Sequence, residues 1–196
     1  AMRDHNVPEW YIDSCMKIKY MFPKAHAAAY MISALRLGWY KVHRPVEYYA
    51  AYFSVRGEDF DGAVVARGRD AVRQKMTEIN MKGKEASAKE EAAYSTLQIV
   101  NEMLARGIEV LPVDLYRSAA KKFLVEDGKL RLPFSSLSGV GEAAAVSLEE
   151  AKNDGGPYIS IDDLQARSKV SRAVIDTLRE AGALGGLPDS SQMSFF

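Results

Sequence analysis

The residues best suited to chemistry form a short glycine turn in the last third of the chain. Gly139 and Gly141 flank one valine, Leu137 precedes them, and an alanine-rich run at 143–145 follows. Glycines in such a turn let backbone amides at the start of a helix approach a phosphate without interference from side chains. Contacts of this kind read the nucleic-acid backbone and not the base sequence. The pattern indicates a helix-hairpin-helix turn, whose predicted DNA contacts are Ser138, Gly139, Val140 and Gly141.

A second hairpin of the same kind is predicted over 164–184. There Lys169-Val170-Ser171 replaces the glycine turn, and Ser171 is a favourable N-cap for the helix that follows. The expected inner face of that helix consists of Val174, Ile175, Leu178 and Ala181. The predicted phosphate contacts of this hairpin are Lys169, Ser171 and Arg172. For the turn of Gly139 and Gly141, a plain turn between two helices is the alternative.

Charge is distributed unevenly along a chain that is neutral overall, with 26 basic and 26 acidic residues. The stretch 1–57 has eight basic and four acidic residues, whereas 135–196 has five basic and nine acidic ones. Overall neutrality excludes a global field that attracts polyanions, so any nucleic-acid contact must be local. Because the region around the hairpins is acidic and no basic residue directly follows Gly141, we expect modest affinity for nucleic acid.

A second group of candidate residues, Lys24, His26 and Tyr30, lies at a predicted helix start after Pro23. His26 and Tyr30 are four positions apart and therefore share one helix face. The Lys24 ammonium and the free amides of the first turn make an anion site feasible, which suits a ligand that bears phosphate. A histidine with a purely structural role is the alternative.

The chain closes with Gln192, Met193, Ser194, Phe195 and Phe196. These residues follow a linker composition of Gly, Pro, Asp and Ser at 185–191. Aromatic side chains exposed at a chain end favour a docking peptide that a partner buries. The alternative is an end that folds back onto its own domain.

Other chemical constellations are missing from the sequence. The single Cys15 excludes an internal disulfide framework and a cysteine-based zinc site. Asp59 and Asp61 are interpreted as the solvated face of a surface loop at 57–62. No apolar run reaches the ~18 residues of a membrane span, and the first residues do not resemble a signal peptide. A cytoplasmic protein without membrane contact is expected.

Helices are expected to position most of these residues. The first helix is predicted to have Asn6 as its N-cap, and the second to run over 24–43, where Pro45 stops it and opens a third. The expected buried stripe of the second helix consists of Ala27, Tyr30, Met31, Ala34, Leu35, Gly38, Trp39 and Val42.

Two more helices are expected before the pattern changes. One is predicted over 63–80, and the other begins with a capping box at Ser87 and Glu90 and ends at Gly107.

From residue 108 the periodicity becomes that of strands. Apolar residues over 108–115 are strand-like, and Asp127-Gly128 predicts a tight turn between strands at 123–126 and 129–132. Short helices are expected after Pro133. The fold class is therefore mainly α with a small β element.

Several segments, taken in this order, resemble one protein family. The most specific is the run Phe22-Pro23-Lys24-Ala25-His26-Ala27-Ala28-Ala29-Tyr30, and the others lie at 5–15, 41–50, 114–118 and 192–196. Together they resemble the C-terminal part of the PolC-type bacterial DNA polymerase III alpha subunit. The terminal peptide has Met193 and Phe195 where the usual form has leucine, and both replacements remain apolar.

The resemblance implies a domain organisation. Residues 1–107 would belong to the polymerase fingers domain, 108–134 would form a small β connector, and 135–186 would form a tandem helix-hairpin-helix domain that binds duplex DNA. Residues 187–196 would be a linker and a clamp-binding peptide formed by Gln192, Met193, Ser194, Phe195 and Phe196. Lys24, His26 and Tyr30 would face the incoming dNTP.

The implied function is DNA-templated DNA synthesis by a DNA-directed DNA polymerase, as part of a longer chain. The palm aspartates that hold Mg²⁺ in this family have no counterpart here, so no cofactor is expected in this segment and no primer extension by the segment alone. Implied partners are the primer-template duplex, the incoming dNTP, the β sliding clamp and other replisome subunits. The alternatives are a stand-alone, non-catalytic helix-hairpin-helix DNA-binding module and a helical interaction protein without a nucleic-acid role.

Overall fold

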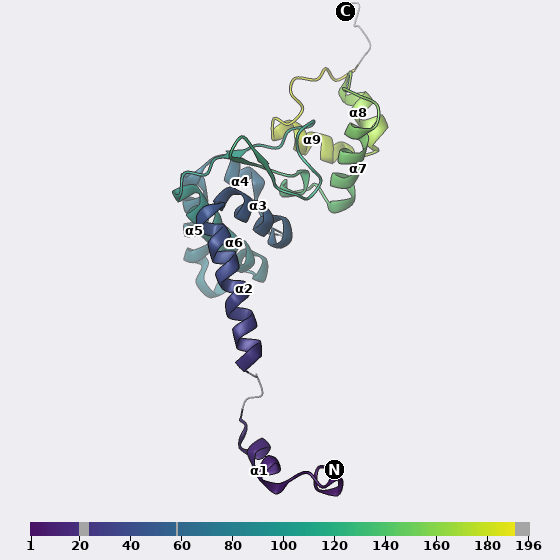
Figure 1. Cartoon of the computed structure of the whole chain (residues 1–196). Helices are drawn as coiled ribbons and strands as arrows, with labels where there is room; N and C mark the ends of the chain where they lie inside the picture. Colours follow the sequence, from purple (N-terminus) through teal and green to yellow (C-terminus); the bar gives the residue numbers. More distant parts are fainter. Residues whose placement is uncertain (20–23, 58, 191–196) are drawn as a thin grey trace, which may run out of the picture. The chain divides into compact units, whose positions relative to one another are not determined.

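The computed structural model describes residues 1–19, 24–57 and 59–190. The chain divides into two units, Ala1–His43 and Arg44–Phe196 (Figure 1). The predicted domain boundaries after residues 107 and 134 both fall inside the second unit. The assignment of 1–107 to a fingers domain therefore remains a prediction from the resemblance.

The first unit consists of short helical elements and one long helix: η1 (Arg3–His5), α1 (Glu9–Lys17) and α2 (Lys24–His43). The predicted bounds of the long helix are confirmed. The predicted N-cap Asn6 is wrong, because Asn6 takes the left-handed conformation (φ 53°) that ends η1. Pro8 occupies the N-cap position of α1 instead.

The apolar stripe predicted on α2 is not buried. Tyr30, Leu35 and Val42 are 69%, 66% and 68% exposed, and α2 has no buried residue. An apolar stripe becomes buried only where a second element covers it. The helices of Ala1–His43 that the structure describes do not cover this one.

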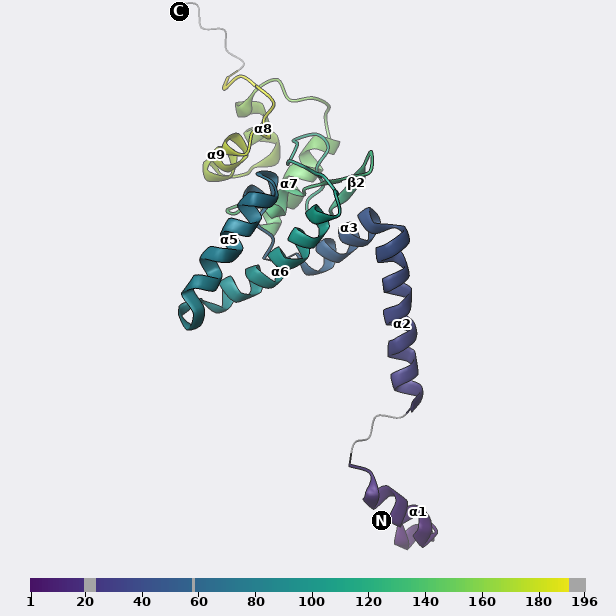
Figure 2. The same ribbon diagram turned by 90° about the vertical axis from the view of Figure 1, so that its left-hand side faces the viewer.

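Helices dominate the first part of the second unit: α3 (Pro45–Arg56), α4 (Gly62–Ala66), α5 (Arg69–Lys82), η2 (Gly83–Glu85) and α6 (Ala88–Ala105). Figure 2 shows α5 and α6 as an antiparallel pair. The capping box of Ser87 and Glu90 is confirmed, and Gly107 takes the expected left-handed conformation with φ 80°.

The single helix predicted over 63–80 is wrong. Gly68 has φ 92° and separates α4 from α5, since a residue in that conformation cannot continue a helix. The solvated role of Asp61 is also wrong, because its carboxylate accepts a 3.0 Å hydrogen bond from the Val64 amide and caps α4.

A three-stranded sheet follows, with strand order β1-β3-β2. The predicted turn at Asp127-Gly128 is confirmed, with φ of 50° and 75°, between the antiparallel strands β2 (Leu124–Glu126) and β3 (Lys129–Arg131). The strand-like stretch 108–115 contributes only β1 (Val110–Leu111), which pairs in parallel with β3. Pro112 ends it because proline has no amide for the ladder.

The remaining elements are η3 (Phe134–Ser136), α7 (Glu142–Asn153), α8 (Ile161–Ser168) and α9 (Arg172–Glu180). Their buried side chains join those of α3 to α6 and the sheet in one hydrophobic core, which runs from Tyr49 to Leu184. The predicted fold class, mainly α with a small β element, is confirmed. The two predicted hairpins therefore share one hydrophobic core with α3 to α6.

Candidate nucleic-acid interface

Hairpin 1 is the turn 137–141 between η3 and α7. Leu137 and Val140 are buried and hold the turn to the core, and the Val140 amide donates a 3.0 Å hydrogen bond to the Leu137 carbonyl. Gly139 has φ 96°, a conformation that favours glycine. Ser138, Gly139 and Gly141 are exposed. The turn therefore presents its backbone to solvent while its two apolar side chains anchor it.

Hairpin 2 is the turn 169–171 between α8 and α9. Lys169 takes the left-handed conformation with φ 56°, Val170 is buried, and the Ser171 hydroxyl accepts a 3.4 Å hydrogen bond from the Val174 amide. Lys169, Ser171 and Arg172 are exposed. The expected inner face of α9 is buried at Val174, Ile175 and Leu178, and half-buried at Ala181.

The two hairpins are structural repeats in which 139–148 corresponds to 169–178. Gly139 and Lys169 occupy the same left-handed position. Gly141 (φ −69°, ψ 164°) and Ser171 (φ −70°, ψ 158°) have nearly identical torsions and are the N-caps of α7 and α9. Buried residues also match, as in the pair Val140 and Val170. The sequence analysis predicted a second hairpin in which Lys169-Val170-Ser171 replaces the glycine turn, and the left-handed residue is indeed glycine in one turn and lysine in the other.

Arg167 links the two hairpins, and sequence reasoning missed it. Its guanidinium donates hydrogen bonds of 2.8 Å and 2.6 Å to the carbonyls of Ala151 and Asp154, at the end of α7. It also lies 4.2 Å from the ring centroid of Tyr158, whose hydroxyl pKa is raised by burial. This arginine is engaged inside the fold, so its role is to hold α7 against α8. These contacts of Arg167 depend on how the loop 154–160 leads the chain from α7 back to α8, and no short sequence pattern predicts that path.

Acidic side chains, together with Arg167 and Arg179, share cavities with the predicted cations of hairpin 2. Arg172 shares a cavity of about 220 Å³ with Asp162 and Asp176. Lys169 shares another, of about 340 Å³, with Glu150. Neighbouring carboxylates weaken the attraction of a cation for phosphate. This arrangement is in keeping with modest affinity for DNA.

The other predicted site residues fall into two groups. One group lies in the first unit, Ala1–His43, and the other lies outside the described residues. On α2, Lys24 and Tyr30 are exposed and His26 is half-buried, with the His26 and Tyr30 rings 4.6 Å apart. The two rings therefore share a helix face, as their spacing predicted. The predicted clamp-binding residues Gln192, Met193, Ser194, Phe195 and Phe196 lie outside the described residues.

Metal-binding clusters and membrane-spanning helices are both absent from the described ranges. Over residues 1–19, 24–57 and 59–190, no three His, Cys, Asp or Glu side chains gather in a way that could hold a metal ion. Within the same ranges, no helix has the length and apolar character needed to cross a bilayer.

Comparison with known proteins first identifies the class of structural motif. A family model described as a helix-hairpin-helix motif matches residues 107–193, which include both hairpins. Over the whole chain, the sequence is 50% identical to "DNA polymerase III PolC-type" of Halalkalibacterium halodurans, 48% to that of Clostridium perfringens and 47% to that of Bacillus subtilis. The chain spans only 14%, 13% and 14% of the lengths of these relatives. It corresponds to a segment of PolC-type DNA polymerase III, and the predicted resemblance is confirmed.

Proposed function

We propose that this chain is the part of a replicative DNA polymerase that holds the primer-template duplex through its sugar-phosphate backbone. The observation that carries the proposal is the repeat of two exposed hairpin turns, each of which starts a helix: α7 has no side-chain cap, and the side-chain cap of α9 bonds only the Val174 amide. Lys169 and Arg172 add positive charge at hairpin 2. The 50% sequence identity to a PolC-type DNA polymerase III supports a role in DNA replication.

The proposal includes the synthesis of DNA by the longer polymerase of which this chain would be a part. In that setting Lys24, His26 and Tyr30 contact the incoming dNTP, and the terminal peptide 192–196 binds the β sliding clamp. In this proposal the Mg²⁺ ions of catalysis belong to the palm domain of the longer chain, and this segment contributes binding.

A tether to the clamp complements weak backbone contacts. A clamp-bound chain end raises the effective concentration of the hairpins at the duplex without any new base contact. The acidic surroundings of Lys169 and Arg172 then do not prevent function, since the hairpins need only modest affinity. The site of action would be the replisome in the cytoplasm.

Equilibrium binding of the 196-residue chain to unrelated duplex sequences, measured over a range of salt concentrations, tests the proposal. We expect similar affinity for all sequences and a linear fall of log K with log salt, because each phosphate contact releases about 0.9 counterion. The double variant Lys169→Gln, Arg172→Gln should reduce this slope by about 1.8. Binding that does not change with salt, or that depends strongly on sequence, would refute backbone recognition.

The runner-up is a stand-alone DNA-binding module of the same helix-hairpin-helix class. It shares the duplex contacts but gives no role to Lys24, His26 and Tyr30. In a longer polymerase chain, substitution of these residues should impair dNTP incorporation if the leading proposal holds. An unimpaired polymerase would favour the module.

A further inference from the structure

The two hairpins match in backbone but differ in charge. The first residue of the helix that follows the turn is Arg172 in hairpin 2 and Glu142 in hairpin 1. The Arg172 guanidinium attracts a backbone phosphate, whereas a carboxylate at the equivalent position repels one. Hairpin 1 therefore has no cation of its own where hairpin 2 has one.

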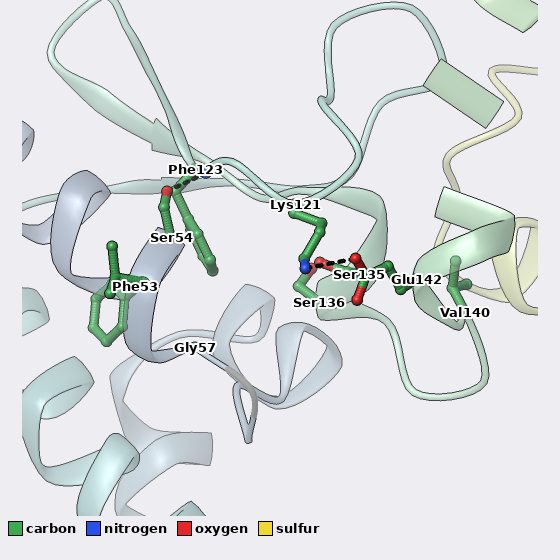
Figure 3. Close-up of a pocket in the computed structure, with 10 residues that line it drawn as sticks. Phe53, Ser54, Gly57, Lys121, Phe123, Ser135, Ser136, Val140 and Glu142 are labelled. Atoms are coloured by element: carbon green, nitrogen blue, oxygen red, sulfur yellow. Dashed lines mark hydrogen bonds and ion pairs between the residues drawn. The ribbon is translucent and has the colours of Figure 1, made fainter. Parts of the chain in front are cut away.

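A cation from another part of the chain lies at this position of hairpin 1. Lys121 Nζ is 2.8 Å from Glu142 Oε1. Figure 3 shows this ion pair at the edge of the cavity. Lys121 and Glu142 line one cavity of about 320 Å³ together with Val140, which belongs to the turn itself. The hydroxyl-bearing residues of the same cavity are Ser54, Ser135 and Ser136. Lys121 thus places a positive charge at the edge of hairpin 1.

The backbone around Lys121 is fixed from several sides. The Ala120 amide donates a 2.9 Å hydrogen bond to Glu149 of α7, and the Ala120 carbonyl accepts one of 3.0 Å from the Ser135 amide. On the other side, the Phe123 amide donates a 2.9 Å hydrogen bond to the Ser54 hydroxyl of α3. Figure 3 shows the last of these contacts beside the cavity. These hydrogen bonds therefore fix the backbone that carries Lys121 next to hairpin 1.

We propose that Lys121 is a backbone-phosphate contact of hairpin 1, and that the Glu142 carboxylate holds this lysine in place until a phosphate replaces it. The inference rests on the proposed duplex binding and adds a residue to it. The side chains of Lys121 and Glu142 are 51% and 69% exposed, so solvent and salt weaken their ion pair. A phosphate oxygen has the same charge sign as the carboxylate and can take over the ammonium group.

The test compares Lys121→Gln with Lys122→Gln in the 196-residue chain. Lys122 is also exposed and carries the same charge, but it does not line the cavity. We expect Lys121→Gln to weaken duplex binding and to lower the salt slope by about 0.9, so that its defect relative to the original chain is about 3.5-fold smaller at 200 mM than at 50 mM salt. Lys122→Gln should leave the slope within error of the original chain. Equal effects of the two variants would overturn the inference.

Glu142→Gln supplies the second arm of a double-mutant cycle. Removal of the competing carboxylate should raise duplex affinity severalfold, and Lys121→Gln should cost more affinity in this background than in the original chain. Additive effects would show that the two side chains do not compete for one phosphate, which would refute the exchange. Thermal unfolding of each variant verifies that the fold is intact.

The same measurements separate this inference from the function on which it rests. Absence of duplex binding by the unmodified chain would overturn the proposed function itself. Salt-dependent binding that Lys169→Gln weakens but Lys121→Gln does not would leave the proposed function standing and overturn only the role of Lys121.

Discussion

Thr177 Oγ1 lies 3.3 Å from the position that a Cβ atom on Gly139 would occupy, so the turn of hairpin 1 packs against α9 of hairpin 2. Gly139 also has φ 96°. Gly139→Ala should therefore destabilise the chain by roughly 1–2 kcal/mol, from the left-handed conformation and the tight contact together. Chemical denaturation measures this loss.

Gly141→Ala is the matched control for that variant. Gly141 has φ −69°, and nothing lies within 4 Å of a Cβ atom built on it. We expect its stability to stay within about 0.5 kcal/mol of the original chain. Its duplex affinity should nevertheless fall, because the new methyl group stands in front of the exposed turn. Unchanged affinity would make the turn a purely structural connection.

Lys169→Gly should separate stability from binding. Lys169 occupies the left-handed position that glycine occupies in hairpin 1, and relief of that conformation should raise stability by roughly 0.5–1 kcal/mol. Loss of the ammonium group should at the same time weaken duplex binding. A variant that is more stable and binds DNA equally well would contradict a phosphate contact at Lys169.

The capping box of α6 should make stability depend on pH. The Lys82 ammonium, followed by the Ser87 amide and hydroxyl, lowers the pKa of Glu90 from its ordinary 4.5 to about 2. The stabilisation is therefore complete above about pH 4.5 and is lost as the pH falls toward 2. Glu90→Gln should flatten the curve of unfolding free energy against pH in this window.

Glu91→Gln provides the control, since it removes the neighbouring carboxylate of the same helix turn without touching the capping box. Equal flattening by both variants would mean that general charge, and not the hydrogen bonds of Glu90, causes the pH dependence.

Ser118→Ala should weaken the junction between the sheet and the helices. The fully buried Ser118 hydroxyl donates a 2.6 Å hydrogen bond to the Leu132 carbonyl and accepts one of 3.0 Å from the Asp114 amide. Loss of both contacts should cost roughly 1–3 kcal/mol of unfolding free energy. Ser95→Ala, on the exposed surface of α6, should cost less than about 0.5 kcal/mol. Similar losses for the two variants would show that the two buried hydrogen bonds of Ser118 add no particular stability.

Deletion of 192–196 should abolish binding to the β sliding clamp and leave duplex binding unchanged. The reason is that the deleted residues are the proposed docking peptide, while both hairpins lie before residue 181. Surface plasmon resonance with immobilised clamp measures the first effect, and duplex titration the second. Clamp binding that survives the deletion would place the docking site elsewhere.

Local signals predicted much of the fold. The bounds of α2, the capping box of Ser87 and the turn at Asp127-Gly128 each depend on a few neighbouring residues, and the structure confirms all three. The break at Gly68 was missed because glycine is tolerated inside a helical pattern, and only its left-handed torsion shows that the helix ends there.

Features that depend on distant contacts could not be predicted. The apolar face of α2 has helical spacing, but spacing does not reveal whether another element covers it. In the candidate interface, the turn residues were predictable from their types. The ion pair of Lys121 with Glu142 joins a residue before β2 to a residue after β3, and no short-range pattern indicates it.

Arg167 has a mechanical consequence for the hairpins. It fastens the carbonyls at the end of α7 to α8, across a loop whose Gly155 and Gly156 would otherwise allow it to bend. With that fastening, the two turns are expected to move as one rigid body. A duplex bound to both turns, as proposed, would then be held or released by the two turns together.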